Sequence, residues 1–124
     1  HKQGKIKYNE KIVLNAGSVG VPLDSNGKAQ FIILKGTPDT WDYEFISIEY
    51  DVEKVVADLH SSGLNKKAPY WCKVSENLLR TGTIPHSMVL ARAMAICKDN
   101  FGECIWPNIP EECWEQAVRE LLPE

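Results

Sequence analysis

The chain has 124 residues and a formal net charge of −3 at pH 7, which suits one domain or a piece of one. Hydrophobic residues make up 44% of the chain and charged residues 25%, a composition typical of ordinary globular proteins. The weak negative charge, without a dense run of Lys and Arg, argues against nucleic-acid binding, and no apolar run is long enough for a transmembrane helix.

Strands and turns are expected in the first fifty residues, where short runs rich in β-branched and aromatic residues alternate with turn signals. The turn signals are Asn26-Gly27, which favours positive φ, and Pro38-Asp39. The predicted strands cover residues 11–15, 29–36 and 41–50. Because turns link them in succession, we expect the three strands to be antiparallel neighbours.

Helices are expected from Asp51 onward, where the apolar spacing changes to a helical period. Asp51 is a suitable N-cap for the first helix, and Gly63 can end it. Pro85 and Pro110 suit the first turns of two later helices. The predicted helices cover residues 52–63, 72–82, 86–102 and 111–122. Strands followed by helices indicate an α+β arrangement or the trailing part of a layered αβ fold.

The segment "NAGSVG", residues 15–20, ends the first predicted strand abruptly. Gly17 and Gly20 permit backbone conformations closed to other residues, so the main chain can approach a ligand or another strand closely. Asn15 and Ser18 can supply hydrogen bonds there. A tight turn without a ligand is the commoner meaning of such a segment. It is neither a Walker loop nor a dinucleotide-binding fingerprint.

Other residues offer few candidates for chemistry. His60 and His86 are expected to be exposed or structural residues of helices. The acids Glu53, Asp58 and Glu112 are expected on solvated helix faces. The four cysteines are Cys72, Cys97, Cys104 and Cys113. They form no Cys-x-x-Cys pair, which argues against a zinc site and favours buried free thiols in a reducing compartment.

The stretch "HKQGKIKYNEKIVLNAGSVGVPLDSNGKAQFIILKG" resembles the C-terminal part of calcineurin-like metallophosphoesterases, in the small bacterial phosphodiesterase branch. In that family a strand ends in Gly-His-x-His, a hairpin follows, and the next strand ends in Asn-Pro-Gly-Ser-Val-Gly. The positions in register here are Asn15, Gly17, Ser18, Val19 and Gly20, with Pro22 behind them. Ala16 departs from the family's proline, which removes some rigidity from the turn.

Further segments extend the resemblance in the right order. Gly27 to Leu34 matches a family strand, Tyr50 to Glu53 matches a "Y-D-[VI]-E" motif, and Gly63-Leu64 matches the end of a helix. "LLRTG", Leu78 to Gly82, is similar to the family's "LRTG". The resemblance covers residues 1–82, and residues 83–124 are interpreted as a helical C-terminal extension without a family assignment.

The resemblance implies a role for His1 as a metal ligand, the last histidine of the Gly-His-x-His motif. A remnant of a purification tag is the alternative for a terminal histidine. The family uses two divalent metal ions, here Mn, Fe, Zn or Ni, which clamp the phosphoryl oxygens and lower the pKa of a bridging water. Asn15 and Ser18 would then support the site from behind the direct ligands, while Gly17 and Gly20 shape the loop backbone.

The remaining ligands of the family come from Asp-x-His, Gly-Asp and Gly-Asn-His motifs, none of which occurs in this sequence. The chain also opens on His1 without an initiator methionine. We therefore expect the C-terminal portion of a longer phosphoesterase, inactive by itself, that acts on phosphodiesters or phosphomonoesters.

The implied fold is a layered αββα metallophosphoesterase sandwich, to which this chain contributes only C-terminal strands and helices. The expected partners are a small-molecule or nucleotide phosphate ester, the missing N-terminal half of the same domain and a second copy in a homo-oligomer. The expected location is the cytoplasm, with no membrane association.

A different class of function stays open, that of a non-catalytic interaction module. Its sheet edge would pair with a partner, because an edge strand offers unpaired backbone groups. Its helical tail would dock through Trp106, Trp114 and the "IWPNIP" stretch. Metal binding by His1 together with another segment would distinguish the enzyme from the module.

Overall fold

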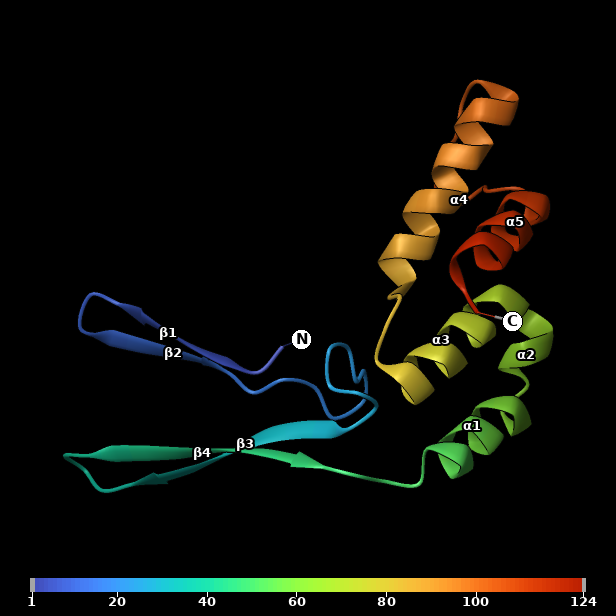
Figure 1. Cartoon of the computed structure of the whole chain (residues 1–124). Coiled ribbons are helices and arrows are strands. Elements are labelled where there is room, and N and C mark those ends of the chain that lie inside the picture. Colours follow the sequence, from blue (N-terminus) through green and yellow to red (C-terminus); the bar gives the residue numbers. More distant parts are fainter. Residues whose placement is uncertain (1, 124) are drawn as a thin grey trace.

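Two β-hairpins precede a group of helices in the computed structural model, which describes residues 2–123 (Figure 1). The strands are β1 Gly4–Tyr8, β2 Lys11–Asn15, β3 Ala29–Gly36 and β4 Trp41–Ile48. The helices are α1 Val52–Ser61, α2 Leu64–Lys67, α3 Pro69–Thr81, α4 His86–Phe101 and α5 Glu111–Leu121. This order confirms the predicted α+β class, with two small antiparallel sheets and five helices in the described part of the chain.

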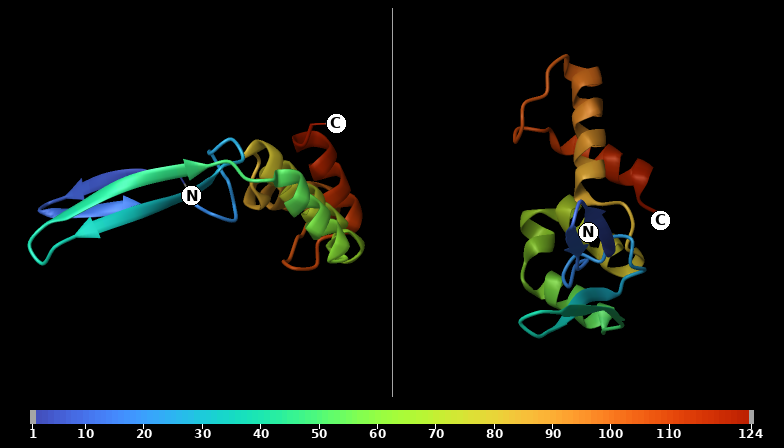
Figure 2. Two further views of the ribbon diagram at one scale, coloured as in Figure 1. Left: turned by 90° about the horizontal axis from the view of Figure 1, so that it is seen from below. Right: turned by 90° about the vertical axis from the view of Figure 1, so that its left-hand side faces the viewer.

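Each sheet is a single hairpin. β1 pairs with β2 from Gly4 opposite Asn15 to Tyr8 opposite Lys11, and Asn9 makes the turn with φ 54°. β3 pairs with β4 along the full length of both strands, from Ala29 opposite Ile48 onward. Both hairpins extend away from the helices, side by side in two perpendicular views (Figures 1 and 2).

The prediction that residues 11–15 and 29–36 are neighbouring strands is wrong. β2 pairs with β1, a strand that the sequence analysis did not predict, and β3 pairs only with β4 among the described residues. The physical reason lies in residues 16–28, which lead to the end of α3 instead of forming a hairpin turn. There the Asp24 N–H donates to the Gly82 carbonyl at 2.9 Å.

The junction between this loop and α3 depends on Gly82. Its φ is +69°, and a Cβ there would lie 2.6 Å from the Pro22 carbonyl oxygen. Gly27 approaches the same helix end, since its Cβ would lie 2.9 Å from the Leu79 carbonyl oxygen. A side chain at Gly82 would therefore meet backbone atoms that cannot rotate away.

The helix boundaries follow the expected signals closely. The Asp51 carboxylate accepts a hydrogen bond from the Lys54 N–H at 3.0 Å, which confirms it as the N-cap of α1. α4 and α5 begin directly after Pro85 and Pro110. α3 begins at Pro69, before the predicted residue 72, because proline is favoured in the first turn. The short α2 was not predicted.

The hydrophobic core lies where α3, α4 and α5 meet. Val74 of α3 packs there with Val89 and Ala93 of α4 and with Cys113 and Ala117 of α5, all at most 1% exposed. Trp114 and Leu121 of α5 are partly buried and pack against this core. The core therefore includes residues on both sides of position 82, and the division into 1–82 and 83–124 stays a prediction.

The thiols of Cys72, Cys97 and Cys113 are buried and free, as predicted, and Cys104 is half-buried. Among residues 2–123 no helix is both long enough and apolar enough to cross a bilayer.

Candidate functional site

The candidate site is the loop that follows β2, residues 15–21. Asn15 Oδ1 accepts a hydrogen bond from the Gly17 N–H at 3.0 Å, and Ser18 Oγ accepts one from the Val21 N–H at 2.9 Å. The two polar side chains singled out from the sequence thus hold the loop's own backbone. The Gln30 N–H donates to the Ser18 carbonyl at 2.9 Å, which fastens the loop to the start of β3.

The two glycines of the loop differ in their surroundings. Gly17 has a φ of +85°, and a Cβ there would lie 2.5 Å from Gln30 Oε1 and 2.6 Å from Gln30 Cβ. Glycine at position 17 therefore permits both the left-handed backbone and the close approach to β3. A Cβ at Gly20 would meet no atom within 4 Å, so close approach gives no reason for glycine there.

Gln3 joins the loop to both hairpins, and the sequence analysis missed it. Its side-chain amide nitrogen lies 3.2 Å from the Ala16 carbonyl oxygen, 3.1 Å from that of Phe31 and 2.9 Å from that of Ile46. Its Cγ would lie 2.9 Å from a Cβ at Gly17. Only its position two residues after His1 could have drawn attention to it, since a lone glutamine carries no pattern of its own.

His1, the predicted metal ligand, lies outside the described residues. Within residues 2–123 no group of three or more His, Cys, Asp or Glu side chains is arranged to hold a metal ion. Asn15 and Ser18 use their oxygens within the loop, as described above. The described residues alone therefore do not fit a two-metal centre.

Large apolar side chains are exposed along both hairpins. Those more than a third exposed on the strands are Ile6, Tyr8, Ile12, Val13, Ile33, Leu34, Trp41 and Ile48. Each hairpin has only two strands, so each of its strands has one unpaired edge in the described structure. The hairpins therefore combine unpaired strand edges with exposed apolar side chains.

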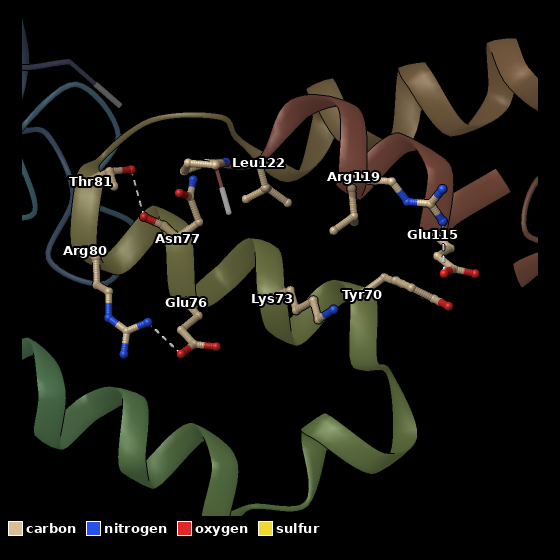
Figure 3. A pocket seen from close by; sticks show the side chains of 11 residues that line it. Tyr70, Lys73, Glu76, Asn77, Arg80, Thr81, Glu115, Arg119 and Leu122 are labelled. Carbon is tan, nitrogen blue, oxygen red and sulfur yellow. Dashed lines mark hydrogen bonds and ion pairs between the residues drawn. The ribbon is translucent and has the colours of Figure 1, made fainter. Parts of the chain in front are cut away.

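A cleft of about 590 Å³ lies between α3 and α5, and none of residues 15–21 lines it (Figure 3). Its charged lining residues are Lys73, Glu76, Arg80, Glu115 and Arg119. Arg119 binds Glu115 at 3.1 Å, and Arg80 binds Glu76 across one turn of α3. These pairs neutralise most of the charge in the cleft, and its lining includes no histidine or cysteine that could act in catalysis.

Arg80 also connects α3 to α1. Its Nε and Nη2 atoms lie 2.9 Å from the two carboxylate oxygens of Glu53, a bidentate pair. The hydrogen bonds from Arg80 hold the pKa of the Glu53 carboxyl below its ordinary value. The expectation that Glu53, Asp58 and Glu112 lie on solvated faces is confirmed, because all three are exposed.

The two described histidines have structural contacts. His60 is exposed and lies 3.3 Å from Glu76. His86 packs between α3 and α4: its Nε2 is 2.9 Å from Ser75 Oγ, and its ring centroid is 4.0 Å from that of Trp71. Burial lowers the pKa of His86. The Ser75 hydroxyl donates to the Trp71 carbonyl at 2.9 Å, which is the arrangement of a helix contact rather than of an activated nucleophile.

Comparisons with known proteins bring no assignment: no family model, no curated protein and no solved structure matches this chain.

Proposed function

We propose that this chain is the C-terminal part of a calcineurin-like metallophosphoesterase, which hydrolyses phosphodiesters or phosphomonoesters with two divalent metal ions. The observation that carries the proposal is the arrangement around Gly17. The Asn-Ala-Gly-Ser-Val-Gly loop contacts Gln3, only two residues after the histidine that the resemblance makes a ligand. In this proposal the internal hydrogen bonds of Asn15 and Ser18 keep the loop rigid where it contacts Gln3.

The proposal requires ligands from another segment, because the described residues do not fit a metal centre. The Asp-x-His, Gly-Asp and Gly-Asn-His motifs of the family would supply them from the N-terminal half of the domain. Two divalent cations, Mn, Fe, Zn or Ni, would polarise the phosphate ester when bound.

The two hairpins support the need for that other half. A two-stranded hairpin is marginally stable by itself in water, and three or more strands with an apolar face are needed for independent stability. Ile12 and Trp41 are 53% and 74% exposed, which leaves apolar surface for further strands to cover. In this proposal the hairpins extend the sheets of the αββα sandwich, and the free thiols agree with a cytoplasmic location.

Hydrolysis of bis(p-nitrophenyl) phosphate tests the proposal. We expect manganese-dependent turnover by the longer protein that carries the three missing motifs, and none by residues 1–124 alone. His1→Ala in the longer protein is expected to reduce the turnover number at least about a hundredfold, since it removes a direct ligand. His60→Ala is the matched control, because His60 is exposed on α1 and should leave turnover unchanged.

A folded longer protein that hydrolyses neither phosphodiesters nor phosphomonoesters with any of the four metals would contradict the proposal. The interaction module would then be the better explanation. Trp106, which is 55% exposed, would be its first contact residue to test, whereas Trp114 is partly buried against the core.

A further inference from the structure

Three of the four cysteines gather where α4 ends and α5 begins. Cys97 lies in the last turns of α4, Cys113 in the first turn of α5, and Cys104 in the segment between them. Cys97 and Cys113 belong to one buried core cluster, and Cys104 packs against that cluster. Cys97 Sγ also donates to the carbonyl oxygen of Glu103, the residue bonded directly to Cys104, at 3.6 Å. Cys97 therefore lies beside the peptide that joins Glu103 to Cys104 as well as in the cluster with Cys113.

The three thiols differ in their access to solvent. Cys97 is 3% exposed and Cys113 is fully buried. Cys104 is half-buried and lines a cleft of about 530 Å³ together with Met94, Lys98 and Ile105. A small molecule in solution can therefore reach the group through Cys104.

We propose that Cys97 and Cys104 are a redox-active pair, which a peroxide converts into an intramolecular disulfide with Cys104 as the residue oxidised first. This inference concerns the helical part of the chain and does not depend on the proposed phosphoesterase activity. The geometry selects Cys97 as the second partner, because its sulfur lies 3.6 Å from the carbonyl oxygen of Glu103, the residue bonded to Cys104, and Cys104 packs against the cluster that contains Cys97.

The chemistry needs only the peroxide and the two thiols. The Cys104 sulfur attacks one peroxide oxygen, the O–O bond breaks, and the other oxygen leaves as water with the thiol proton. Cys104 is then a sulfenic acid. The Cys97 sulfur displaces the hydroxyl group from the Cys104 sulfur, which forms the S–S bond and releases a second water. The two sulfurs lose two electrons, and the peroxide gains them.

Oxidation of this pair is expected to be slow. The contact with Cys97 and burial both raise the pKa of the Cys104 thiol, so little of the reactive thiolate exists at neutral pH. Cys72 provides the internal reference, because it is 2% exposed and lies on α3, outside the cluster that Cys97 and Cys113 share.

Peptide mapping of the full chain after exposure to hydrogen peroxide tests the pair. The protein is unfolded in an alkylating reagent, so that free thiols are blocked, and is then cleaved after Lys98, Glu103 and Glu112. These cuts leave the three clustered cysteines on separate peptides. We expect a Cys97–Cys104 peptide pair that dithiothreitol separates, while Cys72 is still alkylated.

Three variants test the role of each clustered cysteine. Cys113→Ala should keep the disulfide, and Cys104→Ser should leave Cys97 reduced. Cys97→Ala should let Cys104 proceed to the sulfinic acid, because no partner thiol intercepts the sulfenic acid. Sulfinic acid at Cys104 without a disulfide in the unmodified sequence, a Cys97–Cys113 link as the main product, or oxidation of Cys72 as fast as Cys104 would each overturn the proposal.

Discussion

Large apolar side chains are mostly exposed on the hairpins of this chain, whereas apolar side chains are buried between its helices. Along β1 to β4 only Ala29 is a buried hydrophobic residue, while Ile, Leu, Tyr and Trp side chains face solvent. In α3 to α5 the residues at helical spacing are buried against one another. Burial of a Val or Leu side chain contributes roughly 1.5–3 kcal/mol, so the helices contain most of the stabilising core of the described structure.

The two strands of each hairpin therefore leave uncovered the kind of apolar surface that the helices bury. Their β-branched and aromatic content suits a half-buried sheet, yet neither hairpin has a layer packed on it comparable to the helical core. The loop at residues 16–28 is the connection between the two regions, because it binds Gln30 on one side and the end of α3 on the other.

The largest effect on stability is expected when a buried isoleucine of the helices is replaced, and an exposed isoleucine of the hairpins is the matched comparison. Ile96 of α4 is 3% exposed and Ile12 of β2 is 53% exposed. Ile96→Ala should lower the free energy of unfolding by about 2–5 kcal/mol, because it removes apolar contacts and leaves a cavity. Ile12→Ala should change it by about 0.5 kcal/mol or less, as for exposed positions elsewhere. Urea unfolding measures both free energies. Equal losses would show that the exposed isoleucine of the hairpin contributes as much to stability as the buried isoleucine of α4.

An intermediate effect is expected at the connection between the regions. Gly82→Ala places an alanine in a left-handed backbone conformation, which costs about 1–2 kcal/mol. It also adds a Cβ that clashes with the Pro22 carbonyl. Gly63→Ala is the matched control, because its φ of +80° is similar but nothing lies within 4 Å of its Cβ. The free energies of unfolding of the Gly82→Ala and Gly63→Ala variants should differ only by the cost of the clash with the Pro22 carbonyl. If they are equal, the close contact between loop and helix does not stabilise the protein.

The smallest expected effect concerns the pH dependence of the helical region. Burial lowers the pKa of His86 below its ordinary value, so the unfolded chain binds a proton more readily than the folded one. The stability that neutral His86 supports is fully present above about pH 6.5 and is lost as the pH falls further. His86→Gln should therefore flatten the decline of the unfolding free energy between about pH 7 and pH 5.

His60→Gln is the control for this titration, since His60 is exposed and bound only at the surface. His60→Gln should leave unchanged the part of the decline in unfolding free energy that protonation of His86 causes. A decline that His86→Gln does not alter would show that the contact with Trp71 and Ser75 is equally favourable for the charged ring.

Local signals were enough for most of the helices and for the hairpin over β3 and β4. Asp51, Pro85 and Pro110 act on the backbone within one turn, so their effect is visible in the sequence itself. The strand β1 was missed because "GKIKY" alternates weakly between polar and apolar residues, and only its pairing with β2 makes it a strand. The pairing error at residues 16–28 has the same origin, since a turn signal does not say which strands it connects.

In the candidate site, the loop itself could be predicted from the sequence. The left-handed backbone at Gly17 and the hydrogen bonds of Asn15 and Ser18 all arise among residues two or three positions apart. Only the folded structure shows that Gln3 contacts this loop, that Gly82 meets Pro22, and that Cys97, Cys104 and Cys113 lie in one cluster. These contacts join residues far apart in the chain. Their energies depend on the packing of whole elements, which no local pattern of residues encodes.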